Sequence, residues 1–302
     1  MARTRLHARP RSRSVVAGHA TRRSFVAGLT ATFCLPAIHP KAAETPVTFG
    51  LTPVLLDSDL PLLIKLEAYL KQQTGRPVSL VKRRTYQEIS ALLLSGQLDA
   101  AWICGFPFVQ YQDQLDLVAV PVFSGKPLYQ SYIIVPAESP AKSLDDLQGK
   151  SHAFSDPDSN SGFLVTRHLL AQRNQSPNSF FSTSFFTYGH RNVIRAVGSG
   201  LAASGSVDGY IWEVLLHREP ALVEKTKVIW KSELLGFPPV AALKVDRNSE
   251  HVKGIRKALL NISNDPLGRE ILDLLQLDGF VGGEPAMYAD IAAKFEFVRR
   301  QG

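Results

Sequence analysis

Short apolar runs alternate with amphipathic stretches along most of the chain. The runs at residues 47–51, 78–81 and 98–104 have the length and composition of buried strands. Between them, residues 60–73 and 86–95 carry leucine and isoleucine at spacings of three and four, which predicts helices with one buried face. Strands that alternate with helices predict an α/β fold in which mainly parallel sheets are flanked by helices.

The same pattern then resumes, which predicts a second unit of similar size. Further strands are expected at residues 117–122, 131–135, 152–155, 184–188 and 209–212, and helices at residues 143–150, 163–172 and 191–199. A strand at residues 236–243 returns to the first unit, and three helices follow it. We predict a two-lobed α/β protein with a two-strand hinge, in which lobe 1 comprises residues 44–134 and 238–302 and lobe 2 comprises residues 135–237. Two such lobes enclose a ligand cleft that closes about the hinge.

The formal charge of +7 is unevenly distributed. The first 43 residues contain eight basic and no acidic side chains, which leaves 26 basic against 27 acidic residues, a charge of −1, for the rest. The basic excess therefore gives no reason to expect nucleic-acid binding by the mature chain. Arg22 and Arg23 precede Ser-Phe and a weak apolar stretch, a pattern typical of a twin-arginine export signal. We expect residues 1–43 to be a signal peptide for the twin-arginine machinery, with a basic nucleic-acid-binding arm as the alternative.

Export places the mature chain in the periplasm, where we expect a soluble monomer. No later stretch reaches the roughly 20 apolar residues that a membrane-spanning helix requires. Only Cys104 follows the leader, so no intramolecular disulfide is expected. The five histidines after residue 43 show no paired spacing, and the chain has no Gly-rich nucleotide loop. We therefore expect neither a metal nor a cofactor.

Four stretches of the mature chain resemble the phosphate/phosphite/phosphonate branch of the periplasmic binding proteins of ABC transporters. These stretches are residues 75–78, 95–102, 155–162 and 206–210. The third, which contains Ser-Asp-Pro and then Ser-Asn-Ser-Gly, is the most specific. The resemblance implies a protein that captures a small oxyanion by hinge closure and delivers it to an ABC permease.

The Ser-Asn-Ser-Gly segment at residues 159–162, named here the anion loop, also has suitable chemistry of its own. A loop that opens a helix offers hydroxyls and unpaired backbone N–H groups at the positive end of the helix dipole. Ser159, Ser161 and the amides of Gly162 and Phe163 could surround the oxygens of an anion, whereas an ordinary N-cap needs only one of these residues. In the family this loop contacts the phosphonate-like head group, so the resemblance implies ligand contacts from Ser159, Asn160, Ser161 and Gly162.

The resemblance implies further ligand-facing residues, each with a structural alternative. Tyr129 and Tyr132 enter the expected hinge strand, where the family often places an aromatic residue toward the ligand; core packing is the alternative. The family often has a ligand-facing histidine at the position of His190, which otherwise serves as a cap or a surface group. Glu213 follows the expected strand at residues 209–212, where the family commonly has an acidic residue toward the ligand. Asp208 is expected to serve the turn before that strand.

Cys104 departs from the family pattern, because phosphonate binders usually carry a small residue with Gly-Pro at this position. An S–H group is a weak donor to a charged phosphonate and suits a thiophilic centre better. The segment resembles the arsenite-sensing branch of the family, in which a cysteine contacts arsenic. The alternatives are therefore an arsenite- or selenite-type ligand, sensed together with a membrane histidine kinase, or a buried and inert thiol.

A Cys-His enzyme is the alternative from another class, with Cys104 as nucleophile, His190 as base and Glu213 to orient the base. Cys104 and His190 fall in opposite predicted lobes, and no nucleophile motif surrounds Cys104. We therefore expect a binding protein rather than an enzyme. Transport and sensing use the same closure, so the sequence leaves these two roles open.

Overall fold

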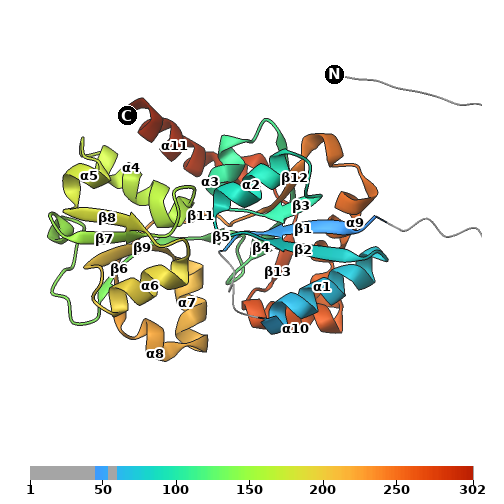
Figure 1. Cartoon of the computed structure of the whole chain (residues 1–302), viewed down its shortest axis with the longest axis horizontal. Helices are drawn as coiled ribbons and strands as arrows, with labels where there is room; N and C mark the ends of the chain where they lie inside the picture. Colours follow the sequence, from blue (N-terminus) through green and yellow to red (C-terminus); the bar gives the residue numbers. More distant parts are fainter. Residues whose placement is uncertain (1–44, 54–59, 302) are drawn as a thin grey trace, which may run out of the picture. The chain divides into compact units, whose positions relative to one another are not determined.

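The computed structural model describes residues 45–53 and 60–301 (Figure 1). The predicted signal peptide at residues 1–43 lies outside the described residues. The described part contains two large sheets covered by helices, and a two-stranded connection. None of its helices is both long enough and apolar enough to cross a membrane.

The first sheet has six strands in the order β13-β4-β12-β3-β1-β2. Its strands are β1 (Val47–Leu51), β2 (Val78–Lys82), β3 (Ala100–Trp102), β4 (Leu115–Val122), β12 (Val240–Leu243) and β13 (Gly279–Val281), and the helices of this lobe are α1 (Leu60–Thr74), α2 (Tyr86–Leu94), α3 (Gly105–Gln110), α9 (Glu250–Leu260) and α10 (Pro266–Leu275). β1 pairs in parallel with β2 and β3, whereas β12 and β13 form antiparallel pairs. The parallel part is the part built from strand–helix–strand units, whose crossovers produce parallel neighbours.

The second sheet has five strands in the order β10-β6-β9-β7-β8. Its strands are β6 (Ser131–Pro136), β7 (Ser151–Phe154), β8 (Thr183–Phe186), β9 (Ser204–Asp208) and β10 (Thr226–Lys231), and its helices are the π-helical turn η2 (Asn160–Leu164), α4 (Val165–Ala171), α5 (Pro177–Phe180), α6 (His190–Gly198), α7 (Gly209–Arg218) and α8 (Pro220–Val223). β7 is parallel to β8 and β9, while β6 and β10 add antiparallel pairs. The predicted helix at residues 143–150 is a single 3₁₀ turn, Asp145–Leu147.

The chain crosses between the lobes at two short strands that pair with each other, β5 (Leu128–Tyr129) and β11 (Leu235–Gly236). These strands are the two-strand hinge. Residues 131–134 pair with β9 of the second sheet, so we place the first crossing at β5 rather than at the predicted boundary between residues 134 and 135. The last helix, α11 (Ala289–Gln301), packs against α3 of the first lobe and α4 of the second.

The strand predicted at residues 209–212 is wrong, because β9 ends at Asp208 and α7 begins at Gly209. Asp208 stops the strand by acting as the N-cap of α7: its carboxylate accepts a hydrogen bond from the backbone N–H of Ile211 at 3.3 Å. The strand β9 was not predicted, because its serine and glycine residues have low strand propensity. A Cβ atom at Gly205 would lie 2.4 Å from Cγ1 of Val193, so the sheet requires glycine where a β-branched residue would have signalled a strand.

Candidate ligand-binding site

Residues at the carboxyl ends of the parallel strands meet between the two lobes, which is where α/β sheets bind their ligands. Cys104 follows β3 of the first lobe, and Tyr86 begins α2 after β2. From the second lobe, Asp156 follows β7, His190 begins α6 after β8, and Asp208 ends β9. All five side chains are buried.

Ser159, the first residue of the anion loop, serves as an N-cap. Its Oγ accepts a hydrogen bond from the backbone N–H of Gly162 at 3.0 Å, so that hydroxyl and that amide already bond each other. By contrast, Ser161 Oγ, Asn160 Oδ1 and the neighbouring Ser155 Oγ are buried and have no hydrogen-bond partner in the described part of the chain. Buried polar atoms without a partner are costly. These three atoms therefore mark the positions where a polar ligand would be held.

Gly162 is required by the close packing inside the anion loop. A Cβ atom at this position would lie 1.8 Å from Ser155 Oγ and 3.0 Å from Ser159 Oγ. Ser131 supports the loop from β6, because its Oγ donates to the backbone carbonyl of Ser161 at 2.6 Å. These contacts fix the shape of the anion loop, in which the Ser161 hydroxyl is buried and has no partner among the described residues.

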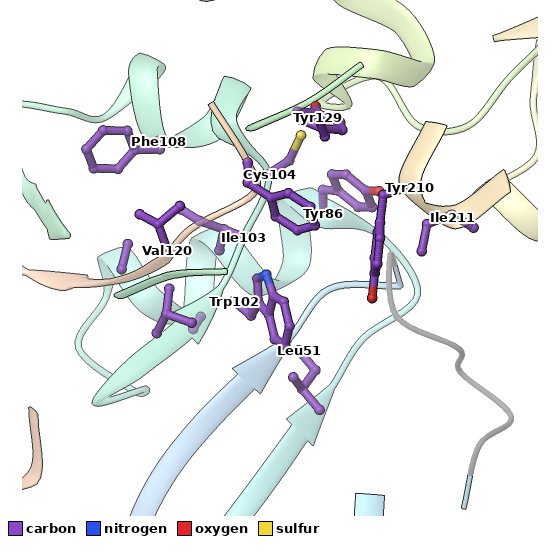
Figure 2. Close-up of a cluster of buried hydrophobic side chains, with 14 of the residues drawn as sticks. Leu51, Tyr86, Trp102, Ile103, Cys104, Phe108, Val120, Tyr129, Tyr210 and Ile211 are labelled. Carbon is purple, nitrogen blue, oxygen red and sulfur yellow. The ribbon is translucent and has the colours of Figure 1, made fainter. Parts of the chain in front are cut away.

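Asn160 joins the anion loop to both the first lobe and the hinge. Its backbone N–H donates to Cys104 Sγ at 3.2 Å, and its side-chain Nδ2 donates to Tyr129 Oη at 2.8 Å. The sulfur of Cys104 is directed toward Tyr129 (Figure 2). Burial raises the pKa of the Cys104 thiol to about 12, so the group is a neutral thiol at physiological pH.

His190 fixes the orientation of the Tyr86 hydroxyl. The backbone N–H of Asp208 donates to His190 Nδ1 at 3.0 Å, and His190 Nε2 lies 3.2 Å from Tyr86 Oη. Because an amide nitrogen can only donate, Nδ1 is the acceptor, and a neutral imidazole carries its proton on Nε2. Burial lowers the pKa of His190 to about 3, which keeps the ring neutral. Nε2–H therefore donates to Tyr86 Oη, and the phenolic hydrogen remains available to a ligand.

The charged groups of the site are carboxylates. Burial raises the pKa of Asp208 to about 7, against the opposing effect of hydrogen bonds from the Ile211 and Tyr210 amides, and burial likewise raises the pKa of Asp156. Among the described residues, Lys294 is the one buried lysine or arginine, and it pairs with Glu233. A buried site with carboxylates and without a buried cation favours a ligand of low negative charge.

Tyr132 and Glu213 lie apart from the anion loop, beside the hinge. The Tyr132 hydroxyl donates to Glu213 Oε1 at 2.9 Å, and Lys231 Nζ donates to Tyr132 Oη at 3.0 Å. Both side chains line a cavity of about 470 Å³ that Tyr129 also borders. The reason is strand alternation: Ser131 points to the anion loop, so the next residue of β6 points to the opposite face. Glu213 lies on α7 rather than after a strand, and its side chain is on the same side of the sheet as that of Tyr132.

Sequence reasoning missed Tyr86, Ser155, Asp156 and Asp208. Ser155 and Asp156 open the most specific of the resembling stretches, which was a usable signal. Asp208 was assigned to a turn, whereas it caps a helix at the centre of the site. Tyr86 gave no signal, because its spacing with Ile89 and Leu93 is that of a core residue.

Two lobes, two crossings and a ring of polar groups at facing strand ends define the class of the two-lobed periplasmic binding proteins. A family model for the periplasmic substrate-binding protein of phosphonate ABC transporters matches residues 49–288. The chain belongs to this family.

Named relatives agree with this assignment. The chain is 26% identical over 247 residues to the phosphate-import protein PhnD of Mycolicibacterium smegmatis, covering 76% of this chain and 70% of that one. It is 24% identical over 262 residues to the phosphonates-binding periplasmic protein of Escherichia coli, covering 80% and 73%. The crystal structure of a binding protein component of an ABC phosphonate transporter from Pseudomonas aeruginosa has a TM-score of 0.78 at 22% identity, covering 85% and 88%, which shows the common fold.

The members of this family are binding proteins, and the geometry offers little to a Cys-His enzyme. Cys104 Sγ accepts from Asn160 and His190 Nε2 meets Tyr86, and no described hydrogen bond joins the two candidates. The pKa of the thiol is raised, whereas a cysteine nucleophile needs a lowered one. No group of three or more His, Cys, Asp or Glu in the described residues is placed to hold a metal ion.

Proposed function

We propose that this protein captures a small oxyanion of the phosphonate, phosphite or phosphate class by closing its two lobes, and delivers it to an ABC permease. The observation that carries the proposal is the group of buried, unpartnered oxygens of Ser155, Asn160 and Ser161 in the second lobe, together with the Tyr86 hydroxyl of the first. The three hydroxyls can donate to the oxygens of an anion, whereas Asn160 Oδ1 only accepts and suits an oxygen that keeps its proton. Because the hydroxyls come from both lobes, binding favours the closed arrangement.

The ligand bound best is one that keeps a proton on its oxyanion. Asp208 places negative potential at the site, and His190 is held neutral, so a dianion meets repulsion without a compensating buried cation. A monoanion has less charge to desolvate. Because the pKa of Asp208 is about 7, affinity for an anion should rise as the pH falls through this value.

Titration calorimetry with phosphate, phosphite, methylphosphonate and sulfate tests the proposal. We expect binding of at least one phosphorus oxyanion, no binding of sulfate, and a smaller radius of gyration with ligand in X-ray scattering. Ser161→Ala should weaken binding by about tenfold to a hundredfold, the value of a hydrogen bond to a charged group. Ser182→Ala, at an exposed serine of the same lobe, is the matched control. Equal affinity of Ser161→Ala and wild type would remove the anion loop from the site.

A second candidate ligand is an arsenite- or selenite-type species, with the protein acting as the partner of a sensor kinase. The position of Cys104 supports it, because its sulfur contacts the backbone of Asn160 in the anion loop and burial keeps the thiol neutral. Wild type and Cys104→Ser should both be titrated with arsenite and selenite. Binding that is lost only in the variant supports this candidate, and unchanged phosphite binding in both proteins contradicts it.

We further propose that twin-arginine export carries the chain to the periplasm, where it works as a monomer. The uneven charge and the paired arginines of the leader support export, and membership of a periplasmic family is consistent with it. Arg22→Lys combined with Arg23→Lys should retain the precursor in the cytoplasm. Periplasmic recovery of that double variant at the wild-type level would contradict the twin-arginine route.

A further inference from the structure

Tyr86 of the first lobe forms hydrogen bonds with the second lobe through both its hydroxyl and its backbone N–H. Its hydroxyl meets His190 Nε2 at 3.2 Å, and its backbone N–H donates to Asp156 Oδ2, also at 3.2 Å. The side chain is fully buried between these contacts. Both hydrogen bonds join different lobes, so both exist only while the lobes are closed.

Asp156 differs from the unpartnered oxygens around it, because the protein already supplies a donor to each of its carboxylate oxygens. Oδ1 accepts the backbone N–H of Asp158 within its own loop at 2.8 Å, and Oδ2 accepts the N–H of Tyr86. The donor of the second bond, the Tyr86 N–H, is also well suited to a carboxylate. Tyr86 is the first residue of α2, where an N–H lacks a partner within the helix and the helix dipole attracts a carboxylate.

Within the first lobe, a capping box at the start of α2 supplies partners for the amides of Thr85 and Glu88. Thr85 Oγ1 accepts from the Glu88 amide at 3.2 Å, and Glu88 Oε2 accepts from the Thr85 amide at 3.0 Å. This capping box leaves the Tyr86 N–H to the second lobe. The lobe that carries the anion loop thus completes the cap of a helix in the opposite lobe.

From this geometry we propose that Asp156 is a positioning residue for closure, which stabilises the closed form through the amide of Tyr86 and does not contact the ligand. The inference rests on the proposed function, since it concerns the closure that retains the ligand. It predicts that Asp156 sets how long any ligand is held, and that the anion loop sets which ligand is held. Loss of the contact between Asp156 and Tyr86 should therefore raise the Kd of every ligand by one common factor.

Asp156→Asn is the sharpest variant, because an amide has one acceptor oxygen where the carboxylate has two. The bond to Asp158 within the loop is the shorter one and can be kept, which turns the amide NH₂ toward the Tyr86 N–H and breaks the bond between the lobes. Glu88→Gln is the matched control, since it alters the cap of the same helix without reaching the second lobe.

The experiment measures Kd and dissociation rate for phosphate, phosphite and methylphosphonate, together with the Tm of ligand-free protein. In Asp156→Asn we expect Kd to rise about tenfold to a hundredfold, equal to about 1.4 to 2.8 kcal/mol, by the same factor for each ligand that wild type binds. The change should lie in the dissociation rate, with the ligand-free Tm unchanged. Glu88→Gln should leave every Kd as in wild type.

Three outcomes would overturn the inference. Unchanged Kd in Asp156→Asn shows that the contact does not stabilise the closed form. A factor that differs between ligands shows that Asp156 contacts the ligand, and a lowered ligand-free Tm shows that it supports the loop of its own lobe. If wild type binds none of the three ligands, it is the oxyanion class of the proposed function that fails, and the same comparison with arsenite and selenite decides the inference: an unchanged Kd in Asp156→Asn would refute it.

Discussion

Replacement of Asp208 by asparagine should stabilise the protein, although this residue lies at the centre of the candidate site. Asparagine is as good an N-cap as aspartate, so the hydrogen bond to the Ile211 amide can be kept. The substitution removes a carboxyl that is 1% exposed and whose pKa burial raises to about 7. The expected gain is therefore the cost of ionising that carboxyl inside the folded protein.

The size of this gain depends on pH in a defined direction. Between the usual aspartate value and about pH 7, the folded protein keeps a proton that the unfolded chain has lost, so the stability of wild type falls as the pH rises through this range. The shift of about three pH units corresponds to roughly 4 kcal/mol at pH values above the folded pKa. The variant and wild type should therefore be about equally stable near pH 4, and the variant should be more stable by up to about 4 kcal/mol near pH 8.

Urea denaturation of both proteins at about pH 4 and about pH 8 measures this difference. Asp265→Asn is the matched control, because Asp265 caps α10 in the same way, from a half-buried position outside the site. An equal difference between Asp208→Asn and wild type at both pH values would refute the argument, and so would a loss of stability near pH 8. The same variant should bind anions with an affinity that rises less steeply than that of wild type as the pH falls through 7.

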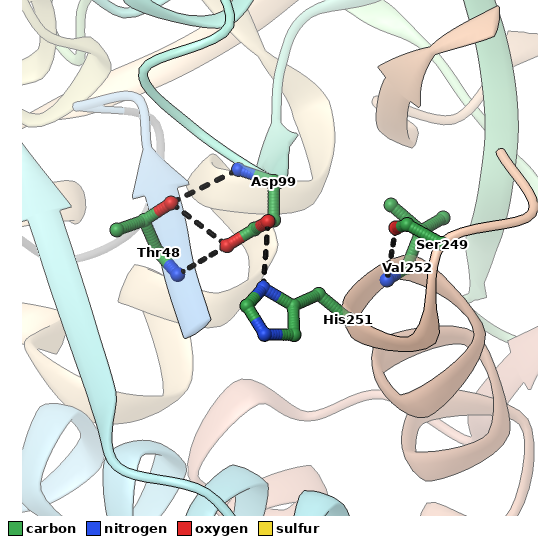
Figure 3. A network of polar contacts seen from close by, with 5 residues as sticks. All are labelled: Thr48, Asp99, Ser249, His251 and Val252. Atoms are coloured by element: carbon green, nitrogen blue, oxygen red, sulfur yellow. Dashed lines mark hydrogen bonds and ion pairs between the residues drawn. The ribbon is translucent and has the colours of Figure 1, made fainter. Parts of the chain in front are cut away.

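Three further substitutions test other parts of the structure. Gly162→Ala should abolish ligand binding and cost about 1 to 3 kcal/mol of stability, because the new methyl group overlaps Ser155; wild-type denaturation and calorimetry would contradict this. Tyr86→Phe should weaken ligand binding about tenfold or more, since it removes a ligand donor and leaves His190 Nε2 without a partner; unchanged Kd would show that the hydroxyl does not face the ligand. His251→Ala should cost about 1 kcal/mol in urea denaturation, because it removes the 2.9 Å contact between His251 and Asp99 (Figure 3). It should leave ligand Kd unchanged, because the network of Thr48, Asp99 and His251 joins α9 to the amino ends of β1 and β3, away from the site. A raised Kd would contradict this structural role.

The alternation of strands and helices predicted most of the fold, since hydrophobic period and length are local properties. It missed β9 (Ser204–Asp208), because the sheet needs Gly205 for close packing and glycine and serine carry no strand propensity, and it placed a strand at residues 209–212 instead, where α7 begins. It also could not give the strand directions, because the antiparallel partners β6, β10, β12 and β13 depend on how the chain returns after each crossing.

The candidate site residues were singled out on different grounds: Cys104 by its chemistry at the end of a strand, Asn160 and Ser161 by a loop that opens a helix, and His190 by the resemblance. In the structure Asn160 contacts Cys104, and His190 contacts Tyr86. Tyr129 and Tyr132 could not be told apart, because only the pairing of β6 shows which face each side chain occupies. Asp156 and Tyr86 were missed since their roles come from a contact between lobes, which leaves no trace in either local segment.

The burial of Cys104 also makes its labelling rate a measure of how often the lobes open. Its side chain is 2% exposed in the closed form, and Cys34, the other cysteine of the chain, lies in the predicted signal peptide. A thiol reagent can then modify the mature protein only during moments when the lobes separate. The rate of labelling at saturating reagent would equal the opening rate, and its suppression by a bound ligand would report residence time without any attached probe.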